Sequence, residues 1–462
     1  MQQRYDIVIV GAGMAGIAAA YALNRGGAGT IAIIDRGPPL ALTSDKSTEC
    51  YRNFWPGPDD AMLSLMNDSI ACLAHHASRS GDRFQLRQRG YLFATARPEE
   101  IDALAAQATE VERFGGGPLR HHGVRSRGGG YPVPSYPVSP AAGFDPTLDG
   151  ADLIADRSMI RDLFPYLAQD TSGVLHVRKC GALSAQQLGM YLLEEAREAG
   201  VALISADVIG IETKAGRVSG VRAVTQAGET TIEAGAVVCA AGPYLKSLTT
   251  MAGANLPLKV EAHTKISLAD HLAVLPRTAP LIIWNDPIEI PWSQDERSML
   301  AELPETARLL RTMPAGVHGR PVGAGNQALM YWTYDCEISD EPRFPMQPSE
   351  FLPDVTLRGM AVMVPGLSAY LDPMPKPYVD GGYYTKTPDN RPLIGPLAMP
   401  GAYVCGAFSG YGIMAACASG ELLAAHVLAT PLPNYASAFR PDRFADPAYL
   451  DRIEGLTLSG QL

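Results

Sequence analysis

The chain has 462 residues, of which 47% are hydrophobic and 19% are charged, and its formal net charge is −10. This composition is typical of a globular protein of two or three domains and argues against a disordered or fibrous chain. An acidic chain without a run of Lys or Arg is poorly suited to a phosphate backbone, so we expect no nucleic-acid partner. The seven cysteines are scattered and odd in number, which predicts neither a disulfide framework nor a metal site.

The sequence also argues against membrane and secretory segments. No stretch of about 18 uninterrupted apolar residues occurs, so we expect no membrane-spanning helix. Residues 7–23 are apolar, but Asp6 precedes them and three glycines interrupt them, which is unlike a signal peptide. We therefore expect a cytoplasmic protein with reduced thiols and no membrane partner.

Residues 5–36 predict one βαβ unit. Residues 5–10 form a short apolar run typical of a buried parallel strand, residues 14–24 have the spacing of an Ala-rich helix, and residues 30–34 form a second buried strand. Glycines at positions 26, 27 and 29 end the helix. A unit of about 30 residues has the size of a mononucleotide-binding half.

A glycine-rich turn, residues 11–16 (GAGMAG), connects the first strand to the helix. In G-x-G-x-x-G the first glycine makes the turn, the second lets the backbone approach a pyrophosphate, and the third lets helix and strand pack closely. The amides and the dipole at the helix start would then hold phosphate. Asp35 ends the second strand at the position where a carboxylate accepts from ribose hydroxyls, although it could also be a strand-end cap.

The remaining chain mixes loops with elements of both kinds. We expect an extended loop at 37–60, helices at 61–80 and 99–113, a strand at 90–94 and a Gly/Pro-rich loop at 114–150. A helix at 184–200 precedes a strand at 201–211, an antiparallel pair at 218–225 and 230–232, and a strand at 236–241. Residues 251–377 predict a mostly β region with inserted helices, and a last strand at 403–405 precedes a helix at 413–428. The histidine pairs 75–76 and 121–122 are expected at the surface.

The glycine turn by itself leaves NAD and FAD open. A nicotinamide-only dehydrogenase would continue β-α-β after residue 36. This chain instead departs into loops and returns to a nucleotide-type strand at 236–241, which favours FAD.

Four segments then form a recognisable set: residues 10–16 with Asp35, residues 184–211, residues 237–242 (VVCAAG), and residues 387–396 (TPDNRPLIGP) with 407–412 (AFSGYG). With them the chain resembles the D-amino-acid oxidase superfamily of flavoproteins, particularly its sarcosine oxidase and glycine oxidase branch. The resemblance implies an α/β fold in which a Rossmann-like FAD-binding domain of the glutathione-reductase type is interleaved with a mostly antiparallel β substrate domain. The expected boundaries are 1–85, 151–250 and 378–440 for the first domain, 86–150 and 251–377 for the second, and 441–462 for a C-terminal tail.

The resemblance also implies how FAD is held. In the superfamily the second glycine turn opens a helix whose N-terminus faces the flavin pyrimidine oxygen, where the helix dipole stabilises the charge of the reduced ring. The residues that the glycine turns and the resemblance assign to the cofactor are Gly11, Gly13, Met14, Ala15, Gly16, Asp35, Arg36, Ser44, Ser47, Thr48, Val208, Ala241, Gly242, Gly406, Gly410, Tyr411, Gly412, Ile413 and Met414.

In this superfamily a hydride leaves the carbon beside an amine and goes to the flavin, while the protein positions the substrate. Arg52 lies in a segment, 48–52 (TECYR), that is similar in spacing to one in sarcosine oxidase, and its planar fork suits a substrate carboxylate. A structural arginine is the alternative. Tyr51, Tyr331 and Tyr384 belong to an aromatic set that predicts either a cage for an amine cation or an ordinary β-domain core.

Three departures from the family pattern shape the expectations. Met414 stands where sarcosine oxidase has a second cationic carboxylate ligand, so a two-pronged clamp is not expected. Gly382 stands where that branch tethers its flavin through cysteine, which predicts noncovalent FAD. The oxygen-activating lysine would fall at 327–329, where none occurs, and Lys265 and His263 are candidate substitutes. Either O2 or an electron-transfer partner is then the acceptor.

The resulting hypothesis is an FAD-dependent oxidoreductase that oxidises a C–N bond of a small-molecule amine or amino acid to an imine, which water hydrolyses. One alternative is the same fold oxidising a hydroxy acid or desaturating a ring in a biosynthetic pathway. A second alternative is a catalytically weak flavoprotein subunit of a complex. The identity of the substrate, its stereochemistry and the oligomeric state stay open.

Overall fold

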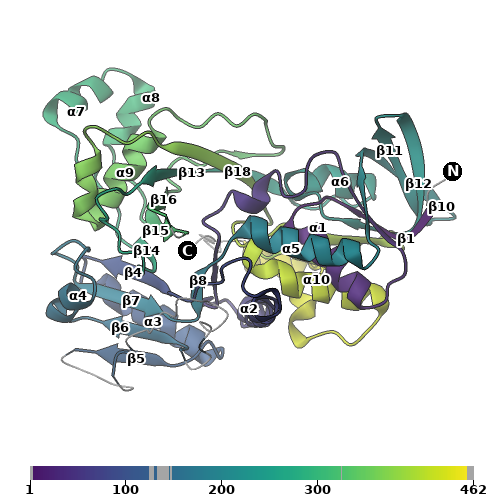
Figure 1. Ribbon diagram of the computed structural model, residues 1–462, viewed down its shortest axis with the longest axis horizontal. Helices are drawn as coiled ribbons and strands as arrows, with labels where there is room; N and C mark the ends of the chain where they lie inside the picture. The colour runs from purple at the N-terminus through teal and green to yellow at the C-terminus, as the bar shows by residue number, and fades with distance from the viewer. Residues whose placement is uncertain (1–3, 124–129, 133–144, 146–147, 324, 455–462) are drawn as a thin grey trace.

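The computed structural model describes residues 4–123, 130–132, 145, 148–323 and 325–454. Two large sheets form the cores of two lobes that lie side by side, with helix α2 (Ala61–Ser80) and strand β8 (Cys180–Ala182) between them (Figure 1). The α/β class predicted from the sequence is confirmed, because parallel and antiparallel sheets occur together in this architecture.

The first sheet is parallel at its centre. β1 pairs in parallel with β2 and β12, and β12 pairs in parallel with β20. Val8, Ile9 and Ile33 on these strands are fully buried, because an apolar run suits a sheet covered on both faces. The strands of this sheet are β1 (Arg4–Val10), β2 (Ile31–Asp35), β9 (Ala202–Ser205), β10 (Asp207–Lys214), β11 (Arg217–Thr225), β12 (Gly228–Cys239), β19 (Leu393–Pro396) and β20 (Ala402–Gly406).

Four longer helices share one core with this sheet: α1 (Met14–Arg25), α2 (Ala61–Ser80), α5 (Ala185–Glu198) and α10 (Gly412–Leu428). The start of α5 shows how the sequence fixes a boundary. Ser184 caps the helix by accepting from the backbone N–H of Gln187, and Leu188 and Leu192 then face the core at helical spacing. No helix in the described ranges is long and apolar enough to cross a bilayer. Shorter helices of this lobe are η1 (Thr43–Asp45), η3 (Gly242–Tyr244), α6 (Leu245–Met251), η6 (Asn434–Phe439), η7 (Pro441–Ala445) and α11 (Pro447–Ile453).

The second sheet is mostly antiparallel. Its strands are β4 (Tyr91–Thr95), β5 (Leu119–His122), β6 (Ala151–Ile154), β7 (Gly173–Val177), β13 (Lys259–Ala269), β14 (Leu281–Trp284), β15 (His318–Val322), β16 (Gln327–Tyr331), β17 (Ile338–Ser339) and β18 (Tyr378–Lys386). Its helices are α3 (Glu100–Arg113), α4 (Arg157–Leu163), α7 (Gln294–Leu300), α8 (Pro304–Ala307), η4 (Arg308–Leu310), α9 (Leu352–Met363) and η5 (Pro365–Tyr370). A separate pair, β3 (Cys50–Arg52) with β8 (Cys180–Ala182), is antiparallel.

The two faces of the second sheet have different partners, because side chains alternate along a strand. Ile266, Ile282 and Met330 point into a core that this lobe shares with α9. Phe93 and Ile283 point the other way, into the core of the first lobe. The face that the second sheet turns toward the first lobe is therefore the one that can contribute to a site between them.

Several elements differ from the sequence prediction. The strand expected at 201–211 is two strands, because the chain leaves β2 at Ala206 and then pairs with β11. The loop expected at 37–60 contains η1 and β3, and the loop expected at 114–150 contains β5, while 124–129, 133–144 and 146–147 lie outside the described residues. The expected surface position of the histidine pairs is wrong for His76 and His122, which are buried.

The expected domain boundaries stay a prediction. One observation bears on them: β6 and β7, which fall within 151–250, pair in the second sheet, and so does β18, which falls within 378–440. By strand pairing, parts of two segments that the sequence analysis assigned to the first domain belong to the second sheet.

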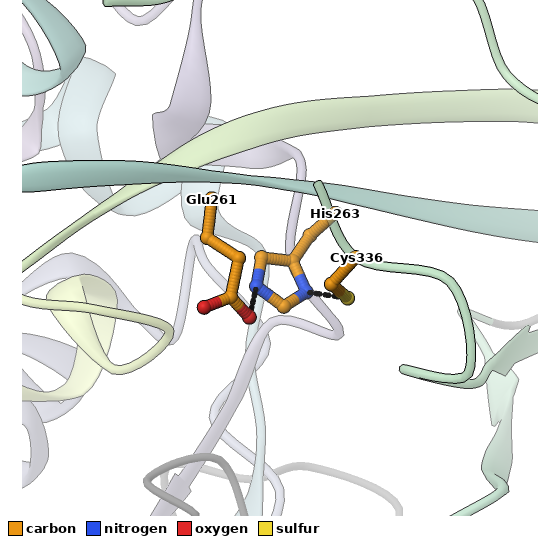
Figure 2. Close-up of side chains that lie close together, drawn as sticks. All are labelled: Glu261, His263 and Cys336. Carbon is orange, nitrogen blue, oxygen red and sulfur yellow. Dashed lines mark hydrogen bonds and ion pairs between the residues drawn. The ribbon is translucent and has the colours of Figure 1, made fainter. Parts of the chain in front are cut away.

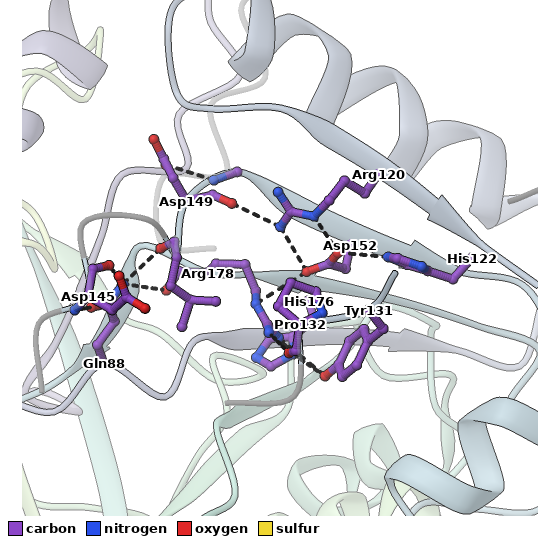
Figure 3. A network of polar contacts seen from close by, with 12 residues as sticks. Gln88, Arg120, His122, Tyr131, Pro132, Asp145, Asp149, Asp152, His176 and Arg178 are labelled. Carbon is purple, nitrogen blue, oxygen red and sulfur yellow. Dashed lines mark hydrogen bonds and ion pairs between the residues drawn. The ribbon is translucent and has the colours of Figure 1, made fainter. Parts of the chain in front are cut away.

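His122 belongs to a buried polar network around Asp152 on β6 (Figure 3). Asp152 is fully buried and accepts from Arg120 Nε at 2.7 Å and from His122 Nε2 at 2.7 Å, and Arg178 Nε lies 3.2 Å away. Burial would raise the pKa of Asp152, but the hydrogen bonds from Arg120 and His122 outweigh it and lower the pKa. The network ties three neighbouring strands together at the far edge of the second lobe.

Candidate cofactor and substrate site

A cavity of about 920 Å³ lies at the carboxyl ends of the parallel strands of the first lobe. β1, β2, β12 and β20 run in the same direction, so the residues that follow them meet at one edge of the sheet. The lining comes from Gly11 after β1, Asp35 at the end of β2, Ala240 and Gly242 after β12, and Gly406 at the end of β20. Segments almost 400 residues apart in the sequence thus form one wall.

The first glycine turn is shaped by close backbone approach. Gly11 has φ +115°, and a Cβ there would lie 2.3 Å from the carbonyl oxygen of Ala240. A Cβ on Gly16 would lie 1.9 Å from the carbonyl oxygen of Gly11, so the helix can reach the strand end only without a side chain. Gly13 faces the cavity and would place its Cβ 3.2 Å from Ser44 Oγ. Two of the three glycines therefore serve packing, and Gly13 leaves space at the cavity.

Asp35 holds the glycine turn in place. Its Oδ2 accepts from the N–H of Ala12 at 2.7 Å and its Oδ1 accepts from the N–H of Gly37 at 2.9 Å. The carboxylate also lines the cavity. Asp35 thus acts as the strand-end cap considered in the sequence analysis, and at the same position it faces the space where a ribose would be recognised.

One end of the cavity is bounded by Arg36, Asp207, Val208 and Tyr244. The guanidinium carbon of Arg36 lies 4.1 Å from the ring centroid of Tyr244, and Arg36 Nη1 lies 3.9 Å from Asp207 Oδ1. This cation–π contact holds the Arg36 guanidinium against the Tyr244 ring at the cavity wall.

The other end is bounded by the turn at 406–412 and the start of α10, whose position depends on the motif at 387–391. Asn390 accepts from Ser409 Oγ through its side chain and from Tyr411 through its carbonyl oxygen. Asp389 is buried and accepts from Arg443 Nε at 2.7 Å and Nη2 at 3.1 Å, and from the Tyr449 hydroxyl at 2.5 Å. The motif therefore connects the C-terminal segment to the turn that opens α10.

Most residues that the sequence analysis assigned to the cofactor line this cavity. They are Gly11, Gly13, Met14, Ala15, Asp35, Arg36, Ser44, Ser47, Val208, Ala241, Gly242, Gly406, Gly410, Gly412 and Ile413. Gly16, Thr48, Tyr411 and Met414 are not among the lining residues. Tyr411 packs against Trp55 with ring centroids 5.2 Å apart, and Met414 lies in the core of the first lobe. Whether the lining residues bind the cofactor stays a prediction.

The second sheet contributes polar side chains to the space between the lobes. Tyr384 lines the cavity and stacks on His263, with ring centroids 4.2 Å apart. Beyond His263 lie Tyr331 at 5.9 Å and then His318, whose ring is 5.0 Å from that of Tyr331. We call these four residues the aromatic row. It crosses β18, β13, β16 and β15 on the face that points to the first lobe.

Two buried cations of the same face bind the backbone of segment 47–52. Lys265 Nζ donates to the carbonyl oxygen of Ser47 at 2.9 Å, and Arg320 Nε donates to that of Thr48 at 2.8 Å. Arg320 Nη2 is buried and forms no hydrogen bond within the described residues, and the carboxylate oxygen Glu49 Oε2 lies 3.6 Å from it.

His318 is a neutral imidazole with a defined tautomer. Burial lowers its pKa to about 4. Its Nδ1 lies 2.8 Å from the carbonyl oxygen of Gly316, so Nδ1 carries the proton and Nε2 is the acceptor. His318 and Arg320 are two residues apart on β15 and therefore share a face.

The predicted catalytic residues divide between the cavity and its surroundings. Tyr384 lines the cavity, whereas Tyr51 and Tyr331 are buried behind it. Arg52 is also buried behind the lining, with its guanidinium carbon 4.5 Å from the Trp55 ring centroid. The sequence analysis missed His318 and Arg320. Their i, i+2 spacing is the signal of a strand face, but Gly319 and Pro321 between them hide the strand.

Comparisons with known proteins agree with this geometry. The family model DAO, FAD dependent oxidoreductase, matches residues 6–426. The chain belongs to this family. It is therefore an enzyme of the FAD-dependent oxidoreductase type, and FAD is its cofactor.

Solved structures share the fold at low sequence identity. L-proline dehydrogenase from P. horikoshii has a TM-score of 0.71 and 19% identity, covering 96% of this chain and 99% of that chain. Glycine oxidase from Geobacillus kaustophilus has the same values. Iminodiacetate oxidase from Chelativorans sp. BNC1 has a TM-score of 0.66 and 16% identity, covering 94% and 98%.

One curated relative is similar over part of the chain. It is a bifunctional protein of tRNA 5-methylaminomethyl-2-thiouridine biosynthesis from Polaromonas sp. (strain JS666 / ATCC BAA-500). The two are 28% identical over 209 residues, which is 41% of this chain and 30% of the relative. The matched part thus spans less than a third of that protein.

The residues around the cavity fit FAD. Its volume lies at the upper end of the range of roughly 300–1,000 Å³ that is typical of cofactor and ligand sites. The starts of α1 and α10 both line it, so two helix dipoles point their positive ends at one ligand. Met14 and Ala15 would hold the pyrophosphate, Asp35 the ribose, and Gly412 and Ile413 the flavin pyrimidine edge. No cysteine or histidine is among the described lining residues, and noncovalent binding stays a prediction.

Proposed function

We propose that this enzyme oxidises a C–N bond of a carboxylate-bearing amine or amino acid, giving an imine that water hydrolyses. Bound FAD would supply the hydride acceptor. The observation that carries the proposal is the buried Nη2 of Arg320 beside the neutral His318, on a sheet face that meets segment 47–52 at the cavity wall. A cation with an unused donor and a base on one face suit a zwitterionic substrate.

His318 supplies the base that amine oxidation needs. An amine must lose its positive charge before the adjacent carbon can release a hydride. The neutral imidazole of His318 can take that proton on Nε2, because its Nδ1–H is held by Gly316. Tyr331 and His263 connect His318 to Tyr384, which lines the cavity and can offer its ring to an amine cation.

Arg320 supplies the recognition of the carboxylate. Its Nε is occupied by Thr48, but Nη2 can donate to a substrate oxygen. A charge-assisted hydrogen bond in a buried place is among the strong ones. Arg52 remains a second candidate for this role, because its charge also acts on His318.

The test is anaerobic reduction of the purified holoenzyme by a panel of compounds, read as bleaching of the flavin absorbance. Amino acids and N-substituted amino acids should bleach the flavin, and their decarboxylated amines should bleach it far more slowly. Bleaching by hydroxy acids alone would instead favour C–O oxidation on the same fold. A flavin that no compound of the panel reduces would favour a catalytically weak subunit.

Variants test the assignment of the anchor. Arg320→Met should raise KM for the carboxylate substrate by the equivalent of about 2–5 kcal/mol, or roughly 30-fold or more, with FAD retained. Arg52→Lys tests the second candidate in the same assay. Arg343→Met is the matched control, because the Arg343 side chain is 82% exposed and its paired atoms with Glu337 are 3.8 Å apart. Equal KM values for Arg320→Met and Arg343→Met would remove Arg320 from the site.

A further inference from the structure

The imidazole of His263, a member of the aromatic row, contacts both a carboxylate and a thiol (Figure 2). Cys336 lies in the segment that connects β16 to β17, and its Sγ is 3.5 Å from His263 Nδ1. The other ring nitrogen, Nε2, lies 2.8 Å from Glu261 Oε1. Lys386 Nζ, on β18, forms an ion pair with Glu261 Oε2 at 2.8 Å and belongs to the same cluster. Carboxylate and thiol thus occupy opposite nitrogens of one ring.

The contacts of Glu261, His263 and Cys336 determine the protonation state of each side chain. Burial would raise the pKa of Glu261, but hydrogen bonds from His263 and Lys386 outweigh it and lower the pKa to about 2, so the carboxylate is ionised. Burial lowers the pKa of His263, which is therefore neutral at pH 7. The carboxylate accepts the proton of Nε2, and Nδ1 is left as the acceptor that faces the thiol. Burial and Glu261 raise the pKa of Cys336 to about 12, so the resting thiol is protonated.

We propose that Cys336, His263 and Glu261 form a peroxide-reactive thiol site, in which Cys336 is the nucleophile, His263 Nδ1 is the base and Glu261 fixes the tautomer of the imidazole. A protonated thiol reacts only when a base removes its proton during attack, and Nδ1 is placed to do this.

Hydrogen peroxide is an electrophile that suits this cluster, because its reduction needs first a base and then an acid. The thiol proton moves to His263 Nδ1 as sulfur attacks one peroxide oxygen. An S–O bond forms and the O–O bond breaks, so sulfur is oxidised by two electrons and the peroxide is reduced. The leaving hydroxide takes the proton back from Nδ1 and becomes water, and Cys336 becomes a sulfenic acid. One imidazole thus serves first as base and then as acid. An alkyl halide would not need the acid, because its leaving group takes no proton.

Other groups that face this site do not offer a competing base. Tyr331 and Tyr384 keep their hydroxyl protons, because burial raises the pKa of each phenol. His318 is held neutral by burial, with its Nδ1–H on Gly316. The titratable and charged groups near Cys336 and His263 are Glu261 on β13, Tyr384 and Lys386 on β18, Tyr331 on β16, His318 on β15, and Tyr334 and Asp335 on the segment of Cys336 itself.

Cys72 on α2 is an internal control. It is half-buried like Cys336, and burial likewise raises its pKa to about 12. Its thiol faces the carboxylates of Glu421 and Asp68 instead of an imidazole acceptor. The other five cysteines, Cys50, Cys180, Cys239, Cys405 and Cys417, are buried.

The test exposes the holoenzyme to hydrogen peroxide with a sulfenic-acid trap and quantifies each cysteine by peptide mass spectrometry. Cys336 should be oxidised at least about 10-fold faster than Cys72, within the range of general-base catalysis. Its rate should stay flat between about pH 7 and 9, since the neutral His263 is the base throughout. The Cys72 rate should rise about tenfold per pH unit, because only its thiolate reacts.

Two variants identify the base. His263→Gln should lower the Cys336 rate about 10-fold or more, give it the rising pH profile of Cys72, and leave Cys72 unchanged. Glu261→Gln should act in the same direction, since an amide does not fix the tautomer, and it serves if His263→Gln fails to fold. A Cys336 rate no greater than that of Cys72, or an unchanged rate and profile in the variants, would overturn the proposal. This assay needs only added hydrogen peroxide. It therefore tests the thiol site even if no amine of the panel reduces the flavin.

Discussion

Replacing Asp389 by alanine tests how the motif at 387–391 stabilises the turn that opens α10. The Asp389 and Arg443 side chains are 2% and 5% exposed. Removing one partner of a buried ion pair costs about 3–5 kcal/mol. Arg443 keeps two carbonyl acceptors, Arg440 at 2.9 Å and Arg391 at 3.1 Å, so we expect the lower end, about 3 kcal/mol.

That free energy converts into a small but measurable shift. With an unfolding entropy of about 2 cal/mol/K per residue, the 462-residue chain should lose roughly 3 °C in Tm. Differential scanning of the holoenzyme measures it. Asp442→Ala is the matched control on the same segment, because Asp442 also pairs with an arginine but its side chain is 58% exposed. We expect that variant to lose less than about 1 kcal/mol.

The pH dependence gives a second readout. Burial would raise the pKa of Asp389, but the hydrogen bonds and charge of Arg443 outweigh it and lower the pKa. A carboxyl whose folded pKa is depressed stabilises the fold above its unfolded pKa of about 3.9, and this contribution disappears as the pH falls through the folded value. The Tm gap between wild type and Asp389→Ala should therefore narrow below about pH 4. Equal Tm values for the Asp389 and Asp442 variants at pH 7, or a gap that persists in acid, would refute the reasoning.

Three further predictions concern the cavity and the buried network. Gly13→Ala should reduce the FAD content of the purified protein with little change in the stability of the apoprotein, whereas Gly16→Ala should destabilise both forms, because its Cβ would meet the backbone of Gly11; equal flavin content and equal Tm for the two variants would contradict this. Acid precipitation should leave the flavin in the supernatant, and colour in the pellet would show a covalent link. Asp152→Ala should cost about 3–5 kcal/mol in a denaturant titration, since Arg178 and Arg120 would lose their buried carboxylate, and an unchanged midpoint would show that the network is dispensable.

Local rules explain what the sequence predicted correctly. The βαβ unit follows from apolar periodicity and glycine placement within 32 residues, and helix α5 follows from its cap and its spacing. The second glycine turn was found through motifs whose residues contact one another, such as Asn390 with Ser409. Short-range patterns of this kind carry most of the first lobe.

The parts that were missed depend on register between distant strands. Cys336, His263 and Glu261 meet because β17 and the preceding segment return to β13 more than 70 residues later, which no local pattern encodes. The side of a strand on which Arg52 lies also depends on pairing, since β3 has three residues and adjacent side chains point to opposite faces. Spacing alone therefore identified the residue but not its surroundings.

Strand β18 has a consequence for how the cofactor reaches its place. It pairs with β13 from Tyr378 to Lys386, which makes it part of the second sheet. β18 also forms hydrogen bonds with the first lobe. Thr385 donates to the carbonyl oxygen of Gly242 at 2.9 Å, and Thr43 donates to the carbonyl oxygen of Tyr383 at 2.8 Å. The lobes cannot swing apart without breaking this strand's bonds on one side or the other. Any exchange of FAD that requires the lobes to separate should consequently be slow, because these hydrogen bonds must break first.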